Sequence, residues 1–284
     1  MPPRPYILNE LTWKDVRDAP YEVAVLPWGA CEPHNRHLPY STDNVETERI
    51  ASLAAGIAWE RGARVVVLPV VPFGVNTGQL DLPLCLNMNP STQALVLRDV
   101  ATALAGQGVP KLVILNGHGG NDFRQMIREL QPAVSLFLCL VNWYQAVDSK
   151  AFFADLGDHA GELETSVMLH LAPDLVRPLS EAGPGAARHF TIAGLREGWA
   201  WAPRQWRRVT DGGREPRGRD VREGAQVRGR GQREVRSVPG GAGGEGCGGD
   251  VRVRRRGFPA LRAQARRESA PCKGAPPGRA RLHH

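Results

Sequence analysis

The sequence contains no run of apolar residues that approaches the ~18 needed for a membrane-spanning helix. Its N-terminus also lacks the basic segment followed by an apolar segment that is typical of a secretory signal peptide. Both absences argue against insertion into a membrane and against export. We therefore expect a cytoplasmic protein without a membrane partner.

Cysteine is scarce and irregularly spaced. The five cysteines include no C-x-x-C pair, and their odd number does not suggest a disulfide framework. They are Cys31, Cys85, Cys139, Cys247 and Cys272. We expect all of them to be reduced thiols.

The first part of the chain lacks any excess of positive charge. The formal net charge of the whole chain is +7, but the 78 residues from Arg207 onward carry +12 and the first 206 carry −5. Those 78 residues also hold half of the 32 glycines. We therefore divide the chain into residues 1–206, which are long enough to fold as one domain, and a basic, Gly/Arg-rich tail at 207–284.

Residues 1–206 alternate predicted strands and helices. Short apolar, β-branched runs predict strands, and longer segments with apolar residues at helical spacing predict helices. In chain order these are strand 23–28, helix 44–61, strand 65–71, helix 91–106, strand 111–115, helix 121–130, strand 134–141 and helix 161–171. This alternation predicts an α/β fold with a mostly parallel sheet covered on both faces.

The predicted helix at 44–61 carries one apolar stripe. Asp43 or Asn44 is available to cap its first turn. The stripe consists of Val45, Ile50, Leu53, Ala54 and Ile57, which lie at helical spacing, and Gly62 ends the helix.

Polar residues follow three of the predicted strands. Ligands of parallel sheets bind at the carboxyl ends of the strands, where these residues would gather. They are Glu32, His34, His37 and Asp43 after the first strand, residues 116–121 with His118 after the third, and His159, Glu162 and Glu164 after the fourth.

These residue types are suited to metal binding. Zn²⁺, Mn²⁺ and Fe²⁺ accept carboxylate oxygens and imidazole nitrogens. Glu32 and His34 are alternate residues that could point to one side, and His118 stands between glycines that let the backbone pack closely around it. Each cluster alone has a plainer explanation, as a surface loop or a Gly-rich turn. Together they favour a metal site.

Three motifs in this sequence resemble those of the creatininase (creatinine amidohydrolase) family. Glu32-Pro-His34-Asn-Arg-His37-Leu-Pro followed by Thr42-Asp43 is similar to the family's first motif, Asn116-Gly-His118-Gly-Gly-Asn121 to its second, and His159-Ala-Gly-Glu162-Leu-Glu164-Thr-Ser166 to its third. The motifs occur in the family's order. The resemblance extends from about residue 7 to Thr210.

The resemblance implies a three-layer αβα sandwich with a binuclear metal site that hydrolyses a small-molecule amide. Two divalent ions, Zn, Mn or Fe, would activate a water for attack on the C–N bond. Glu32 and His118 match ligands of one metal, His34 a ligand of the other, and Asp43 the carboxylate that bridges both. His159 matches the histidine that carries a proton to the leaving nitrogen. The resemblance also implies a homo-oligomer.

One position departs from creatininase, which has a second-metal carboxylate where this sequence has Gly120. Either the second metal site is weak or empty, or another carboxylate fills it. Our candidate is Glu164, with Glu162 as second choice; otherwise Glu162 is a catalytic residue beside His159. Residues two apart on a helix lie ~200° apart, so only one should face the site. Alternatively, Glu164 orients His159 or caps the helix. The Gly-Gly form resembles family branches that hydrolyse other amides, so creatinine itself is not implied.

The substrate-binding residues are not identified by the sequence. Residues 76–79 and 87–89 follow the second strand and could contact substrate, although a role in loop structure is favoured. Tryptophans at 143, 199 and 201 could wall a pocket, but packing is the more common role.

The tail allows three interpretations. An Arg/Gly-rich segment could bind nucleic acid, which would make the chain a binding protein rather than an enzyme, but it has no regular repeat and almost no aromatic residues. A solvated disordered tail is simpler. We favour a third hypothesis, that residues 207–284 are a shifted reading frame of GC-rich DNA, which would leave an intact or an inactive, truncated enzyme.

A codon comparison supports the frameshift hypothesis. The family usually continues here with Ala-Thr-x-Glu-Lys-Gly. The nucleotides C-GCG-ACG-TGC-GAG-AAG-GG encode such a segment, and regrouped as CGC-GAC-GTG-CGA-GAA-GGG they encode residues 219–224 of this chain. Sequencing the gene locus tests the idea, and an intact frame without an upstream insertion or deletion would contradict it. No specific nucleic-acid partner is then expected.

Overall fold

A parallel four-stranded sheet forms the centre of the computed structural model, which describes residues 2–153, 159–182 and 191–203. The strand order is β2-β1-β3-β4, and all three neighbouring pairs are parallel. The strands are β1 (Val23–Trp28), β2 (Val65–Val67), β3 (Lys111–Asn116) and β4 (Phe137–Asn142). The tail at 207–284 lies outside the described residues, and so do the interpretations placed on it.

Helices connect successive strands, as parallel pairing requires. The α-helices are α1 (Trp13–Val16), α2 (Thr42–Glu60), α3 (Pro90–Gly106), α4 (Arg124–Leu130), α5 (Glu162–Leu171) and α6 (Ala193–Glu197). Short 3₁₀ turns lie at Leu8–Glu10, Gln131–Ala133, Trp143–Gln145, Ser149–Ala151, Pro173–Leu175 and Leu179–Glu181.

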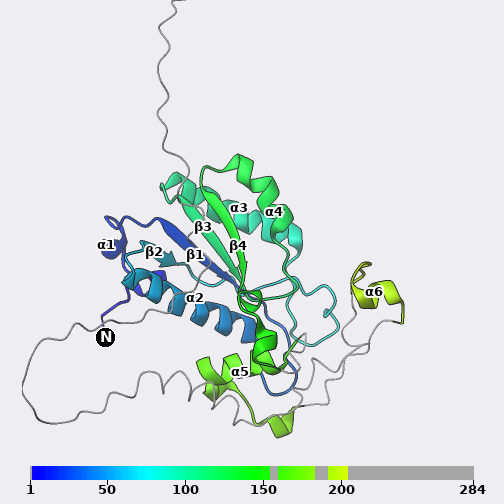
Figure 1. The fold of residues 1–284 in the computed structure, drawn as a ribbon. Helices are drawn as coiled ribbons and strands as arrows, with labels where there is room; N and C mark the ends of the chain where they lie inside the picture. The colour runs from blue at the N-terminus through cyan, green and yellow to red at the C-terminus, as the bar shows by residue number, and fades with distance from the viewer. Residues whose placement is uncertain (1, 154–158, 183–190, 204–284) are drawn as a thin grey trace, which may run out of the picture. The chain divides into compact units, whose positions relative to one another are not determined.

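The two faces of the sheet are covered by different helices (Figure 1). Leu26 and Trp28 of β1 pack into a core with residues of α3 and α4. The alternate residues Val23 and Val25 pack on the opposite face, together with Ala51 and Ala55 of α2. Successive side chains of a strand point to opposite faces, so this division makes three layers. The predicted αβα sandwich with a parallel sheet is confirmed.

Two strands are shorter than the apolar runs predict. β2 ends at Val67 rather than Val71, and a single bridge from Trp28 to Val71 continues the pairing. Pro69, which has no N–H for a ladder, lies in that gap. β4 begins at Phe137 rather than at residue 134, because a 3₁₀ turn that contains Pro132 precedes it.

The apolar stripe of α2 is buried only in part, because Val45 and Ile50 pack against core clusters but the other three residues do not. Leu53 and Ile57 are more than half exposed, and Ala54 is exposed as well. The helix instead buries two alanines and the polar residues of its first turns, which are Thr42, Asp43, Glu46 and Thr47. Asp43 does not cap the helix, because Ser41 holds the N-cap position. The polar start of α2 is buried because it forms part of the site described below.

No helix in the described part of the chain is long and apolar enough to cross a membrane. The cysteines at 31, 85 and 139 are free thiols, as expected for this part of the sequence.

Candidate metal centre

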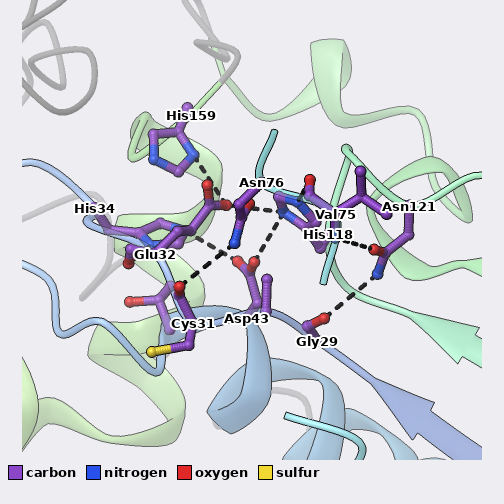
Figure 2. A network of polar contacts seen from close by, with 12 residues as sticks. Gly29, Cys31, Glu32, His34, Asp43, Val75, Asn76, His118, Asn121 and His159 are labelled. Carbon is purple, nitrogen blue, oxygen red and sulfur yellow. Dashed lines mark hydrogen bonds and ion pairs between the residues drawn. The ribbon is translucent and has the colours of Figure 1, made fainter. Parts of the chain in front are cut away.

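Side chains from three separate segments meet beyond the carboxyl ends of β1 and β3 (Figure 2). Glu32 and His34 follow β1, Asp43 lies in the first turn of α2, and His118 follows β3. His159 approaches from the segment before α5. All five are at least nine-tenths buried. The structure therefore brings together residues that are up to 127 positions apart in the sequence.

Asp43 occupies the middle of the cluster and presents its two oxygens to different histidines. Its Oδ1 lies 2.9 Å from His34 Nε2, and its Oδ2 lies 3.1 Å from His118 Nδ1. Glu32 Oε1 lies 2.8 Å from the same nitrogen of His118. One carboxylate thus links two groups of ligand atoms.

Backbone carbonyls orient both imidazole rings. His34 Nδ1 lies 3.1 Å from the carbonyl oxygen of Glu32, and His118 Nε2 lies 3.1 Å from that of Val75. A carbonyl only accepts hydrogen bonds, so these ring nitrogens must carry the protons. In the neutral rings, lone pairs on His34 Nε2 and His118 Nδ1 therefore face carboxylate oxygens. This is the usual arrangement of a metal-binding histidine, whose second nitrogen donates to a carbonyl.

The donor atoms fit a divalent cation. Three of them, His34 Nε2, Glu32 Oε1 and Asp43 Oδ2, make no hydrogen bond within the described part of the chain, although each has a polar atom about 3 Å away. Adjacent ligands of an octahedral ion at about 2.1 Å would lie about 3.0 Å apart, close to the spacing observed. A cation between the lone pairs would turn their mutual repulsion into attraction.

Three overlapping groups of residues could each hold one ion. Their ligand atoms all lie within 4.8 Å of one another. The groups are Glu32, Asp43 and His118; His34, Asp43 and Glu164; and Glu32, His34 and His159.

The charges around Asp43 also favour a cation between these side chains. Burial lowers the pKa of His34, but Asp43 more than offsets this and raises that pKa to about 10. Burial likewise opposes ionisation of Asp43, yet His34 and His118 hold its pKa far below the usual range. Positive charge is thus strongly favoured between these groups. Protons supply it in the metal-free protein, and a metal ion must displace them to bind.

Glu164 lies at the second group and also contacts the backbone. Its Oε1 is 3.8 Å from His34 Nε2, and its Oε2 accepts a hydrogen bond from the backbone N–H of Ala160. Burial raises the pKa of Glu164, and His34 opposes that shift. One oxygen therefore holds the backbone just before α5, and the other faces the candidate site, so the ligand role of Glu164 stays a prediction.

The backbone excludes a side chain at position 120. A Cβ atom built on Gly120 would lie 2.4 Å from both His118 Nε2 and the Val75 carbonyl oxygen, which are hydrogen-bond partners. Real Cβ contacts are never so short. A carboxylate in this position, as creatininase has, would break the contact that orients His118.

Of the other predicted site residues, His159 lies at the cluster and Glu162 does not belong to a candidate metal group among the described residues. Nε2 of His159 lies 2.7 Å from the Pro33 carbonyl, and its Nδ1 lies 3.7 Å from Glu32 Oε1. Its ring packs against that of His34, with centroids 4.2 Å apart. Glu162 begins α5 and belongs to none of the candidate metal groups found in the described residues.

His37 turns away from the cluster. Its Nε2 lies 2.9 Å from the Thr165 hydroxyl, so it connects the first motif to α5. Burial, with a smaller contribution from His34, lowers the pKa of His37 to about 4.

Several residues that support the cluster were not among the predicted site residues. Asn121 accepts hydrogen bonds from Gln93 and from the backbone N–H of Val75, and so holds the residue whose carbonyl contacts His118. Glu46 lies one turn after Asp43 and is fully buried, and burial raises its pKa well above the usual value, with further contributions from Glu164 and Asp43. The motif itself contained Asn121, and the i, i+3 spacing from Asp43 could have indicated Glu46.

The tryptophans considered for a pocket wall differ in burial. Trp143 packs in the core on the α2 face of the sheet, as the packing interpretation predicts. Trp199 and Trp201 are 76% and 85% exposed and wall no site among the described residues.

Comparisons with known proteins identify the family of this chain. The family model described as creatinine amidohydrolase matches residues 9–233. A mycofactocin precursor peptide peptidase from Mycolicibacterium smegmatis is 32% identical over 54% of this chain and 59% of its own length. The creatinine amidohydrolase of Pseudomonas putida is 28% identical over 60% of this chain and 73% of its own length.

Solved structures show the same fold. A Bacteroides fragilis protein classed as a creatinine amidohydrolase superposes with a TM-score of 0.71 and 41% identity, covering 78% of this chain and 89% of its own. Creatininase structures of a Zn-Zn type and with Mn each give a TM-score of 0.59 at 23% identity, covering 78% and 81% of this chain and 92% and 96% of their own. The chain therefore belongs to the creatininase family, whose members are amidohydrolases.

Proposed function

We propose that this chain hydrolyses the C–N bond of a small amide at a site that holds two divalent metal ions. The observation that carries the proposal is the placement of Asp43, whose two oxygens each lie about 3 Å from a different histidine. A carboxylate in this position can bridge two ions. Zn and Mn are the first candidates, because the creatininase structures contain them.

Each protein group has a proposed role. Glu32 and His118 bind one ion, His34 and Glu164 bind the other, and Asp43 binds both. Two ions at such a site activate water and polarise the amide carbonyl. Hydrogen bonding of His159 Nε2 to Pro33 leaves Nδ1 facing the site, where it can carry a proton to the leaving nitrogen. Glu162 remains a candidate catalytic residue.

The test of the bridging role is metal content together with activity. Asp43→Asn keeps the shape of the side chain but removes its charge, so we expect it to lose both ions and at least 10²-fold of the hydrolysis rate. Purified, metal-loaded protein would be assayed on creatinine, formyl amides, other small cyclic amides and a short peptide. Full activity in protein stripped of metal would contradict the proposal.

The second metal site has its own test. Glu164→Gln should reduce the metal content from two equivalents to one, because the neutral amide is a poor ligand. Glu162→Gln, on the same helix, should retain both ions, and its activity then reports whether Glu162 takes part in the chemistry. Loss of an ion in Glu162→Gln but not in Glu164→Gln would reverse the two assignments.

We further propose that the enzyme is cytoplasmic and forms a homo-oligomer without a nucleic-acid partner, and that residues 207–284 are not needed for metal binding. The family resemblance and the sequence composition support these proposals.

A further inference from the structure

A glutamine from the loop between β2 and α3 reaches into the metal centre. The side chain of Gln79 is 4% exposed, and its Nε2 donates a hydrogen bond to Oε2 of Glu32. The other oxygen of Glu32, Oε1, lies 2.8 Å from His118 Nδ1 and makes no hydrogen bond within the described part of the chain. The two oxygens of Glu32 therefore have different partners, one in the protein and one in the metal centre.

A neighbouring thiol contacts the other end of the Gln79 amide. Cys85 Sγ lies 3.8 Å from Gln79 Oε1, a distance that suits a weak S–H···O hydrogen bond. Burial raises the pKa of the Cys85 thiol to about 12, so the sulfur keeps its proton. If the amide were reversed, its oxygen would face the carboxylate, and the N–H groups would face the thiol proton.

Backbone and side-chain contacts hold this loop against the segment that carries Glu32. Leu86 N–H donates to the Cys31 carbonyl at 3.0 Å. Asn76 donates from its side chain to the Leu86 carbonyl at 2.9 Å, and its contact with the Cys31 carbonyl is visible in Figure 2. The loop that positions Gln79 is therefore attached to the residue next to Glu32.

We propose that Gln79, oriented by the Cys85 thiol, is a positioning residue that keeps Glu32 as a one-oxygen ligand of its metal ion. The inference rests on the proposed function only in taking Glu32 as a ligand. Without the N–H of Gln79, the buried Oε2 would have no donor among the described residues and would turn toward the ion or toward solvent. Partners that orient metal ligands in this way typically contribute 10–100-fold to metal affinity.

The test compares variants of similar shape. Gln79→Met removes the donor, and Gln79→Glu places a second carboxylate against Glu32. Thr77→Val is the control, because Thr77 is exposed on the same loop. Mn²⁺ affinity would be measured by competition with a chelating dye, and the Mn²⁺ electron paramagnetic resonance spectrum would report ligand geometry.

We expect Gln79→Met to weaken binding of one of the two ions by 10–100-fold and Gln79→Glu to weaken it more, with an altered resonance spectrum and an unchanged control. Thermal unfolding of the metal-free variants shows whether each still folds. Wild-type affinity and spectrum in a folded Gln79→Met would overturn the proposal. If Asp43→Asn also bound metal normally, the proposed function itself would fail, so the two failures are distinguishable.

The thiol has a separate test. Cys85→Ala should weaken Mn²⁺ binding several-fold, Cys85→Ser should recover part of the loss through its hydroxyl, and Cys139→Ala on β4 should have no effect. Equal affinity of Cys85→Ala and wild type would remove the thiol from the proposal.

Discussion

Gly120 has no side chain because none would fit between His118 and the Val75 carbonyl. The absence of the creatininase carboxylate at this position is therefore part of how His118 is held. At the scale of single residues, small size and orientation matter here as much as the ligands themselves.

We predict that Gly120→Ala weakens metal binding by at least 10-fold and destabilises the protein by about 1–3 kcal/mol, since the new methyl group must displace backbone. Gly119→Ala is the matched control, because a Cβ at Gly119 meets nothing within 4 Å. Metal titration and urea unfolding measure both effects. Equal behaviour of the two variants would show that position 120 tolerates a side chain.

We predict that the buried His37 makes the stability of the fold fall in acid. Its pKa falls from 6.5 to about 4 on folding, because burial disfavours the charged ring. The unfolded chain therefore binds this proton more readily, and the stabilisation present above pH 6.5 is lost as the pH falls toward 4. The whole effect is about 3 kcal/mol at most. Unfolding in denaturant across this range, on chelator-treated protein, should show a shallower decline for His37→Gln than for the exposed control His170→Gln.

At the scale of elements, helix α2 buries polar residues at the candidate site and leaves some of its large apolar residues exposed. Sites in parallel sheets lie at the carboxyl ends of the strands. The first turns of α2 lie at that end of the sheet, and Asp43 and Glu46 are buried there. Further along the same face, Ala51 and Ala55 are buried, and Ile50 packs beside them. Leu53 and Ile57 lie on the other side of the helix and remain exposed.

This arrangement predicts that two alanines of α2 differ in how well they tolerate a larger side chain. Ala51→Leu should cost about 1–3 kcal/mol, because Ala51 is 2% exposed in the core. Ala54→Leu should change the stability by less than about 0.5 kcal/mol, because that position is exposed. Chemical unfolding of both variants checks the helix orientation, and a larger loss for Ala54→Leu would restore the face expected from periodicity.

At the scale of the whole molecule, the question is which part of the chain carries the activity. The metal groups lie between residues 32 and 164, whereas the family match continues to residue 233. We predict that chains ending at Thr210 and at Arg233 both bind metal. Metal at 100 times its dissociation constant should stabilise each by about 2.7 kcal/mol, because only the folded state binds it. Thermal unfolding with and without metal measures this, and a Thr210 chain that no longer responds to metal would extend the domain beyond our boundary.

The sequence by itself determined the order of strands and helices, the α/β class, and the short polar segments after the strands. These features are local, because periodicity, glycine and proline act within a few residues of themselves. The motif residues Glu32, His34, Asp43 and His118 were recognisable because the short motifs that contain them resemble those of the creatininase family.

Only the tertiary structure decided which face of α2 is buried, that Glu164 rather than Glu162 faces His34, and that Gln79 contacts Glu32 and Asn121 contacts Val75. Each of these outcomes depends on contacts between segments far apart in the chain. Burial and ligand geometry are properties of such contacts, and no local pattern encodes the distance between two side chains that meet only after folding.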